Sequence, residues 1–347
     1  MNDFNPNDIG VANGNYFGLP CDAESADIVL LSVPWDATVS YGKGTSDGPQ
    51  AIIDASLQVD LFDEKIAQSW RTKAWTVPVS EEIHHLSEQA RQSAERVIGR
   101  LEEGEEVLND NPDLLMVNEA SAKLNNYVAT ESEKYLSKGK MVAVVGGEHS
   151  VPFGLIKTLG EHYEDFGVLH LDAHSDTRKH YEGFEYSHAS IMYNVLNKVP
   201  SVSKIVQVGI RDYCSDEHQL MFSSPKIAPF TDFMINDAMF NGKNWASVCD
   251  EIIAQLPQNV YISFDIDALT PEHCPNTGTP VPGGLTFAQA DYLIYRLSAS
   301  GKHIVGFDLC EVAPGEEGEW DANVGARILY KLLVYTAKNR KSLIFAD

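Results

Sequence analysis

The sequence predicts a single α/β domain in which helices cover both faces of a parallel sheet. One observation is a series of short, continuous apolar runs, which are typical of strands buried on both faces. A second is that stretches with helical periodicity lie between several of these runs, as in βαβ units. A third is the length of 347 residues without an internal repeat, a low-complexity tract or a clear linker. The predicted strands are 28–33, 74–79, 141–145, 167–171, 204–208, 260–264 and 303–307, and the predicted helices are 81–103, 117–137, 151–160, 188–198, 244–256, 286–299 and 322–338.

The first 25 residues differ in composition from the rest of the chain. They are polar and contain Asn, Gly and Pro, so we expect an irregular N-terminal arm over residues 1–25 and one domain over residues 26–347. We hypothesise that the arm packs on a neighbouring subunit or covers a site. The chain starts without a basic segment and an apolar run, so no signal peptide is expected. No stretch approaches the ~20 apolar residues that a membrane span requires.

Charge and cysteine content narrow the class of protein. The net charge is −24, from 26 Lys and Arg against 50 Asp and Glu. Because such a chain repels phosphate backbones, we expect no nucleic-acid partner. The same charge favours metal ions or a cationic substrate, although it also serves solubility. The five cysteines form no CxxC pair, which argues against a disulfide framework and against a zinc finger. We expect a soluble cytoplasmic protein with reduced thiols and no membrane partner.

Acidic side chains and histidines follow four of the predicted strands. Carboxyl ends of parallel strands meet at one edge of a sheet, where ligands bind in open α/β folds. We therefore expect these side chains to lie close together. The segments, each directly after its strand, are GGEHS (146–150), DAHSD (172–176), DID (265–267) and the pair Asp308 and Glu311.

The spacing within these segments favours a metal centre. Alternate residues of an extended segment project to the same side, so Asp172, His174 and Asp176 are expected to converge, as are Asp265 and Asp267. Carboxylates at this density repel one another unless cations neutralise them. Mixed carboxylate and imidazole ligands without a thiolate suit Mn²⁺ and related ions. Six such ligands, counting His149, exceed the needs of one ion, so two ions bridged by shared carboxylates fit better.

Taken singly, each of these motifs has an ordinary structural explanation. A DxD pair is often a turn, and Gly146 and Gly147 before His149 suit a plain turn. Their occurrence at successive strand ends makes coincidence improbable. The remaining histidines, among them His170, have no partner at a useful spacing.

Together with further segments, these motifs make the sequence similar to the arginase/agmatinase (ureohydrolase) family over roughly residues 26–340. The resemblance implies a three-layer α/β/α fold with a central parallel sheet. It implies a binuclear-metal hydrolase that cleaves a guanidino compound to urea and an amine, with manganese or, in some relatives, nickel, in a homotrimer or homohexamer. The matching segments are GTSDGPQAI (44–52), GGEHS (146–150), DAHSD (172–176), YSHAS (186–190), GIRD (209–212), SFDIDALTP (263–271), TGTPVPGGLT (277–286) and DLCEVAP (308–314).

The resemblance also implies a role for each site residue. Two bound ions would lower the pKa of a water molecule that they share. Asp176 would accept the proton of this water, His188 would shuttle protons because imidazole titrates near neutrality, and Glu311 would pair with the guanidinium. One ion would be held by His149, Asp172, Asp176 and Asp265, and the other by His174, Asp172, Asp265 and Asp267, with Asp172 and Asp265 bridging.

The substrate end departs from the family pattern. Arg178 stands where arginases typically have Asn and agmatinases often have Tyr. An arginine pairs bidentately with a carboxylate, so it favours a guanidino acid such as arginine, homoarginine or guanidinobutyrate. The alternative is that Arg178 points to solvent or pairs with a neighbouring acid such as Glu182 or Glu185.

The position that would hold a substrate amine is only partly retained. Asp212 of GIRD is present, whereas the second acid that arginases use aligns with Cys214, for which Asp216 could substitute. Thr270 replaces the familiar Asp of SxDxDxxDP, and Glu148 replaces a commoner Asp, but neither position is a ligand.

Other activities stay open from the sequence. An agmatinase or a guanidine hydrolase is a close alternative to an enzyme for guanidino acids. A formimidoylglutamase also has an Arg after its DAHxD segment, but such relatives usually lack the shuttle histidine that is His188 here. A non-catalytic metal-binding member would be expected to have lost a ligand, Glu311 or His188, and none is lost.

Overall fold

The computed structural model describes residues 4–315, 318–339 and 344–345. Its central element is an eight-stranded sheet with the strand order β3-β1-β4-β9-β8-β5-β6-β7, and every neighbouring pair is parallel. A separate antiparallel pair is formed by β2 (Ile66–Ala67) and β10 (Ile344–Phe345). The strands of the large sheet are β1 (Ile28–Val33), β3 (Ala74–Val77), β4 (Met141–Gly146), β5 (Phe166–Leu171), β6 (Val202–Val208), β7 (Ile227–Phe230), β8 (Asn259–Asp265) and β9 (His303–Cys310).

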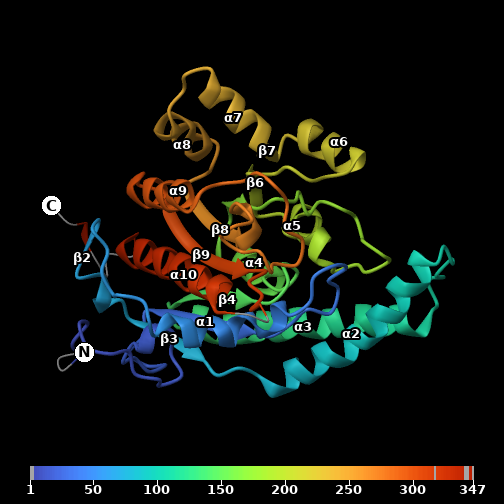
Figure 1. Ribbon diagram of the computed structural model, residues 1–347, viewed down its shortest axis with the longest axis horizontal. Coiled ribbons are helices and arrows are strands. Elements are labelled where there is room, and N and C mark those ends of the chain that lie inside the picture. Colours follow the sequence, from blue (N-terminus) through green and yellow to red (C-terminus); the bar gives the residue numbers. More distant parts are fainter. Residues whose placement is uncertain (1–3, 316–317, 340–343, 346–347) are drawn as a thin grey trace.

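Helices cover both faces of this sheet, which confirms the predicted three-layer α/β/α fold. Figure 1 shows α8, α9, α10 and α1 as one row of helices, while the long helices α2 and α3 reach beyond the sheet. The first row comprises α1 (Gly48–Ser56), α8 (Trp245–Ala254), α9 (Phe287–Ala299) and α10 (Trp320–Asn339), the opposite layer comprises α2 (Glu81–Glu102), α3 (Pro112–Leu136), α4 (Phe153–His162) and α5 (Ile191–Lys198), and α6 (Ser215–Ser223) and α7 (Asp232–Phe240) follow β6 and β7.

The core explains why the strands are continuous apolar runs. Successive side chains of a strand point to opposite faces, and Val29 and Leu30 accordingly belong to two different buried clusters. One cluster fills the space under α1, α8, α9 and α10, and the other lies under α2 to α5. All six residues of β1, β4 and β5 are buried. A sheet buried on both faces therefore positions the strand ends rigidly.

Among the described α-helices and strands, α1, α6, α7, β7 and the short pair β2 and β10 were not predicted from the sequence. β7 is a short edge strand that contains Pro229, a residue that a central strand does not tolerate. α3 begins five residues before its predicted start, at Pro112, where the Asn111 side chain accepts hydrogen bonds from the amides of Asp113 and Leu114. This pairing of a capping Asn with a Pro in the first turn is the signal that marks the true start.

The second half of the predicted N-terminal arm packs on the domain that follows it. Tyr16 and Phe17 are buried, the Tyr16 amide donates to Thr76 Oγ1 at 3.0 Å, and the Tyr16 hydroxyl lies 2.9 Å from Ser32 Oγ. Residues 1–3 of the predicted arm, and residues 346–347 at the end of the predicted domain, lie outside the described residues. The boundary at residue 25 stays a prediction.

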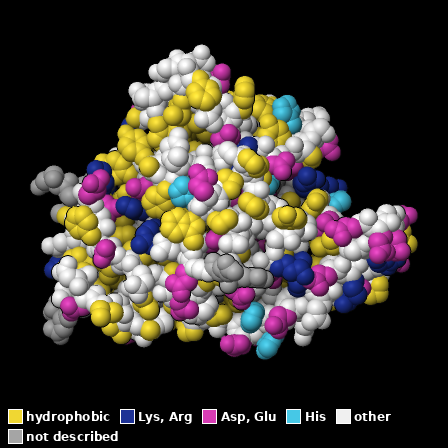
Figure 2. All heavy atoms as spheres, in the orientation of Figure 1, with side chains coloured by type: hydrophobic (Ala, Val, Ile, Leu, Met, Phe, Trp, Pro, Cys, Tyr) yellow, Lys and Arg dark blue, Asp and Glu magenta, His cyan; other side chains and the backbone are white. Residues whose placement is uncertain are grey.

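The surface reflects the acidic composition. Figure 2 shows Asp and Glu side chains spread over the visible face, with Lys and Arg among them. All five cysteines are free thiols. Within the described ranges, no helix combines the length and the apolar composition that crossing a bilayer requires.

Candidate metal centre and active site

The candidate site lies at the carboxyl ends of four adjacent central strands. In the order β4-β9-β8-β5, these strands are followed by, or end in, His149, Glu311, Asp265 and Asp172. The residues come from segments that are far apart in sequence, and the parallel topology brings them to one edge of the sheet. Their placement agrees with the strand-end prediction.

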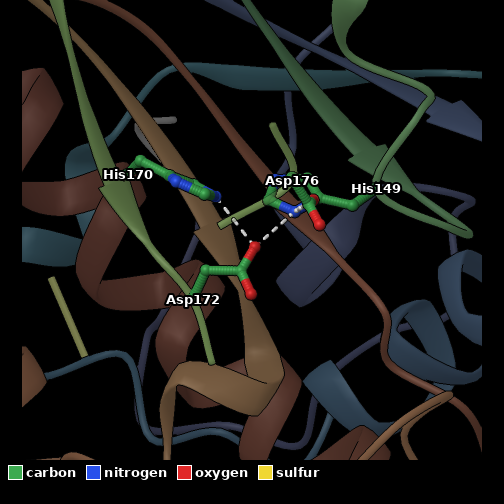
Figure 3. A group of neighbouring side chains, drawn as sticks. All are labelled: His149, His170, Asp172 and Asp176. Carbon is green, nitrogen blue, oxygen red and sulfur yellow. Dashed lines mark hydrogen bonds and ion pairs between the residues drawn. The ribbon is translucent and has the colours of Figure 1, made fainter. Parts of the chain in front are cut away.

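A first group of side chains surrounds the His149 ring. His149 Nδ1 lies 2.9 Å from Asp172 Oδ2, 3.2 Å from Asp176 Oδ2 and 3.2 Å from Asp265 Oδ2. All four side chains are buried. Figure 3 shows His149 and His170 directed toward the Asp172 carboxylate, with Asp176 beside His149. This is the set of residues expected at the first metal ion.

A second group adjoins the first through Asp172. His174 Nδ1 lies 3.0 Å from Asp267 Oδ2 and 3.5 Å from Asp172 Oδ1. The two carboxylate oxygens of Asp172 therefore face different groups, Oδ2 toward His149 and Oδ1 toward His174. Asp265 is tied to the second group because its Oδ1 accepts a hydrogen bond from the Asp267 amide at 2.8 Å. Two groups that share Asp172 could each hold a metal ion: His149, His170, Asp172 and Asp176 form one, and Asp172, His174 and Asp267 form the other.

The backbone that brings these groups together is not extended throughout, so this part of the prediction was wrong. Asp176 has a left-handed backbone with φ of 53°, which turns its side chain toward His149. Asp267 lies in a short 3₁₀ turn, Ile266–Ala268, which Asp265 caps. Glu311 also has a positive φ, 63°. Such conformations are costly for residues with a side chain, and they occur at sites that use the geometry.

The electrostatics of the cluster fit a pair of divalent cations. Burial, together with the charge of Asp172, raises the pKa of Asp176 to about 6. Burial and the neighbouring charges of Asp267 and Asp172 raise the pKa of Asp265 well above its usual value. Donor atoms around an octahedral ion with bonds of about 2.1 Å lie roughly 3 Å apart, as the atoms around His149 Nδ1 do. Cations at these positions would remove the repulsion.

His170 supports the cluster and was not singled out from the sequence. It is fully buried, and its Nε2 lies 2.8 Å from Asp172 Oδ2 while Gln207 Nε2 lies 3.2 Å from its Nδ1. Because Gln207 donates there, the His170 Nε2 hydrogen faces Asp172. The signal was present in the strand, since His170 stands two residues before Asp172 on the same face. Ser263 Oγ supports His149 in a similar way, 2.8 Å from Nε2.

A pocket opens in front of these groups. Three predicted catalytic or metal-binding residues, Asp176, His174 and His188, line it together with Arg178 and Asp212, two of the three predicted substrate contacts. The other lining residues are Ser40, Tyr181, Ala189, Tyr213, Glu217 and Thr279.

Arg178 does not stand free in this pocket. Its Nε lies 3.6 Å from Glu217 Oε2, and its guanidinium lies 4.7 Å from the centre of the Tyr181 ring. Glu217, which is buried, also accepts hydrogen bonds from the amides of Thr177 and Cys214. The partner of Arg178 is thus neither Glu182 nor Glu185. Glu217 holds the third position of α6, where an acid closes a capping box, and that spacing is the signal that the sequence offered.

Glu311, the third predicted substrate contact, is buried beside His149 and does not line the pocket. Its Oε1 accepts a hydrogen bond from the His149 amide at 2.9 Å, while its Oε2 has no hydrogen-bond partner among the described residues. Burial and the charge of Glu148 raise the Glu311 pKa well above its usual value. The chain at Gly278 passes so close that a Cβ there would lie 2.9 Å from Oε2. One oxygen of Glu311 is therefore a buried acceptor without a donor among the described residues.

Comparison with known proteins identifies the family. The model of the arginase family matches residues 26–335. The chain belongs to the arginase family. As a member it is a metal-dependent ureohydrolase, an enzyme that hydrolyses a C–N bond of a linear amidine. The family predicted from the motifs is confirmed.

Relatives of this arginase-family protein cover almost its whole length. It is 32% identical over 321 residues to an N(1)-aminopropylagmatine ureohydrolase of Thermus thermophilus, covering 92% of each chain. It is 28% identical to an agmatinase of Edwardsiella ictaluri, covering 93% of this chain and 91% of the other. The crystal structure of proclavaminate amidino hydrolase from Streptomyces clavuligerus has a TM-score of 0.73 at 23% identity, covering 96% and 99% of the two chains, and confirms the fold.

Proposed function

We propose that this enzyme hydrolyses a guanidinoalkyl amine of the agmatine type to urea and an amine. The observation that carries the proposal is the contact between Arg178 and Glu217 in the pocket. The positive charge of Arg178 is already balanced there, so it is a weak anchor for a substrate carboxylate. This favours the agmatinase alternative over the guanidino acid that Arg178 suggested from the sequence alone.

The remaining charges of the pocket suit a cationic tail. Asp212 is exposed and lines the pocket, and no ion pair holds its carboxylate among the described residues. A protonated amine desolvated against carboxylates forms charge-assisted hydrogen bonds. The names of the relatives, an N(1)-aminopropylagmatine ureohydrolase and an agmatinase, also describe substrates with a guanidinium at one end and an amine beyond it. Asp216, in contrast, does not line the pocket.

The proposed cofactor is a pair of manganese ions, with nickel as the alternative. Oxygen ligands and imidazoles without thiolates suit both ions. When bound, the two ions lower the pKa of a water molecule and stabilise charge that develops on the substrate. The proposed ligands are His149, Asp172, Asp176 and Asp265 for one ion, and His174, Asp172, Asp265 and Asp267 for the other.

Three side chains are proposed to orient the substrate and to transfer protons. The unpartnered Oε2 of Glu311 pairs with the guanidinium and orients its carbon. Asp176 takes up the proton of the attacking water. His188 lines the pocket and is proposed to pass protons out of the site; burial with the charge of His174 lowers its pKa to about 3, so its resting ring is neutral near pH 7.

Urea release by the purified enzyme, loaded in parallel with manganese and with nickel, tests this function. The substrates are agmatine, N(1)-aminopropylagmatine, arginine, guanidinobutyrate and guanidine. We expect turnover of one or both amines and little turnover of the two guanidino acids. If only guanidinobutyrate or arginine were turned over, Arg178 would be the anchor of the substrate carboxylate. If only guanidine were turned over, the proposed contacts with a cationic tail would be wrong. No urea with either metal would direct the search to formimidoylglutamate or to a non-catalytic role.

We also propose that the enzyme is a cytoplasmic homotrimer or homohexamer without a nucleic-acid or membrane partner. The high negative charge supports the absence of nucleic acid. Light scattering during size-exclusion chromatography measures the assembly. A monomer at micromolar concentration would contradict it.

A further inference from the structure

The His188 ring is held by a buried threonine on the opposite side of the site. The His188 amide donates to Thr38 Oγ1 at 3.0 Å, and the ring Nδ1 lies 3.3 Å from the same oxygen. Thr38 has no exposed surface. No hydrogen bond to His188 Nε2 occurs among the described residues. The two ring nitrogens therefore have different surroundings, one bonded to the protein and one turned away from Thr38.

The direction of the bond between Thr38 and His188 is decided by a third residue, Glu148. This fully buried carboxylate faces three donors: the Thr38 amide at 2.7 Å from Oε2, the Thr38 hydroxyl at 2.8 Å from Oε1, and the Ser150 hydroxyl at 2.5 Å from Oε1. Burial raises the pKa of Glu148 to about 7, and its ionised carboxylate, which these three donors surround, only accepts hydrogen bonds. The single hydroxyl hydrogen of Thr38 is thus committed to Glu148, and Thr38 Oγ1 has only lone pairs left for His188.

We infer that Glu148 and Thr38 fix the tautomer of His188. The hydrogen of the neutral ring lies on Nδ1, where Thr38 accepts it, and Nε2 is left with a free lone pair for the proton that the reaction releases. Glu148 and Thr38 are positioning residues, since neither touches the reacting atoms. The catalytic consequence rests on the proposed function of His188, whereas the tautomer itself does not.

The variant Glu148→Gln reverses the chain of hydrogen bonds without changing its shape. The Thr38 amide needs an acceptor, so the amide oxygen of the new Gln faces it. The NH₂ group then donates to Thr38 Oγ1, and the Thr38 hydroxyl turns its hydrogen toward His188 Nδ1. His188 Nε2 must now carry the ring hydrogen, and it no longer accepts a proton.

Neutron crystallography of the metal-loaded enzyme in heavy water reads the tautomer directly. We expect deuterium on His188 Nδ1 in the wild type and on Nε2 in E148Q. Deuterium on Nε2 in the wild type would overturn the inference. This map is independent of turnover, so it decides the tautomer even if no guanidino substrate is cleaved and the proposed function fails.

Kinetics separate a positioning role from a packing role. We expect E148Q and Thr38→Val to lower kcat by about tenfold to a hundredfold with little change in KM, below the ~10²–10⁴ that loss of a whole acid–base group causes. Thr38→Ser keeps the hydroxyl and should retain wild-type kcat. An unchanged kcat in E148Q, or equal losses in the Ser and Val variants, would contradict the assignment.

A matched control contacts the loop of Thr38 from helix α2. Ser87 Oγ accepts a hydrogen bond from the Asp36 amide, two residues before Thr38, at 3.1 Å, and Ser87 does not line the pocket. Ser87→Ala therefore tests general loosening of this loop. It should leave kcat close to wild type, and a loss equal to that of T38V would assign the effect to loop stability instead. Metal content measured on each variant confirms that the neighbouring His149 still functions.

Discussion

Glu217 Oε2 lies 3.6 Å from Arg178 Nε, and this contact places a carboxylate and a guanidinium of opposite charge side by side in the pocket. The buried carboxylate of Glu217 balances the positive charge of Arg178 in this pocket. Glu217→Gln releases the positive charge of Arg178 and keeps an acceptor for only one of the two amides, because Thr177 donates to Oε1 and Cys214 donates to Oε2.

We therefore expect E217Q to raise KM for agmatine about tenfold to a hundredfold, the equivalent of one charge-assisted hydrogen bond of ~1.5–3 kcal/mol, with a smaller effect on kcat. The same variant should improve turnover of guanidinobutyrate. Steady-state kinetics on both substrates check this, with Asp237→Asn on the exposed surface of α7 as a control. An unchanged preference between the two substrates would show that the contact does not set specificity.

A second prediction concerns the two oxygens of Asp172, which face His149 and His174 separately. Asp172→Asn should weaken both metal sites, whereas Asp267→Asn should affect mainly the ion beside His174. Metal content after dialysis, measured by elemental analysis, should fall toward zero for D172N and toward one ion per chain for D267N. Asp165→Asn, at an exposed loop, is the control. Equal metal content in D172N and D267N would argue against Asp172 as the shared ligand.

The third prediction is a pH dependence of metal-free stability. Burial lowers the pKa of His149 and His174, but their carboxylate neighbours outweigh it and raise both pKa values well above the ordinary ~6.5. Folded His149 and His174 thus bind protons that the unfolded chain loses, and their stabilisation is lost as pH rises past 6.5. Asp176, with a folded pKa of about 6, keeps its proton where the unfolded chain has lost it, so its contribution also falls as pH rises from about 4 to 6.

Bound metal displaces these protons, so the stabilisation by metal should grow with pH. The melting temperature of EDTA-treated and manganese-loaded enzyme, compared at about pH 6 and about pH 8, measures it. We expect the difference between the two forms to widen at the higher pH. A difference that is constant or narrows would mean that other groups dominate the linkage.

The fourth prediction concerns Gly278, whose backbone runs over Glu311. A Cβ at this position would lie 2.9 Å from Glu311 Oε2, the oxygen proposed to hold the guanidinium. Gly278→Ala should displace that oxygen and lower kcat/KM by up to about a hundredfold, since a shift of about 1 Å at a reacting group can have this effect. Metal content should not change. Gly99→Ala, in open space on α2, is the control. Full activity in G278A would mean that the segment yields and Glu311 does not move.

The ligand positions were predictable because of where they stand relative to the strands. His149, Asp172 and Asp265 follow or end continuous apolar runs, and parallel topology brings such positions together whatever the loops do. The contact of Arg178 with Glu217 was not predictable in this way. It depends on how the chain after β6 (Val202–Val208) folds back over the pocket, which no periodicity records.

The errors have local causes as well. Position 176 is not a glycine, so no residue type marks its left-handed backbone. The prediction of an extended DAHSD segment was therefore wrong at Asp176. His170 was not predicted to belong to the site, although the carboxylate that it contacts, Asp172, lies two residues later, directly after the same strand.

The strand order determines when the metal site can form during synthesis of the chain. β4 and β5 carry His149 and Asp172, but they are not neighbours, because β9 and β8 lie between them. Both intervening strands are made later than the two that they separate. A nascent chain that has completed β5 and the DAHSD segment after it has four of the six proposed ligands, but the strands that hold them in register are still missing. Metal capture must wait until nearly all of the polypeptide has been synthesised, and loading of the two ions then reports that folding of the sheet is finished.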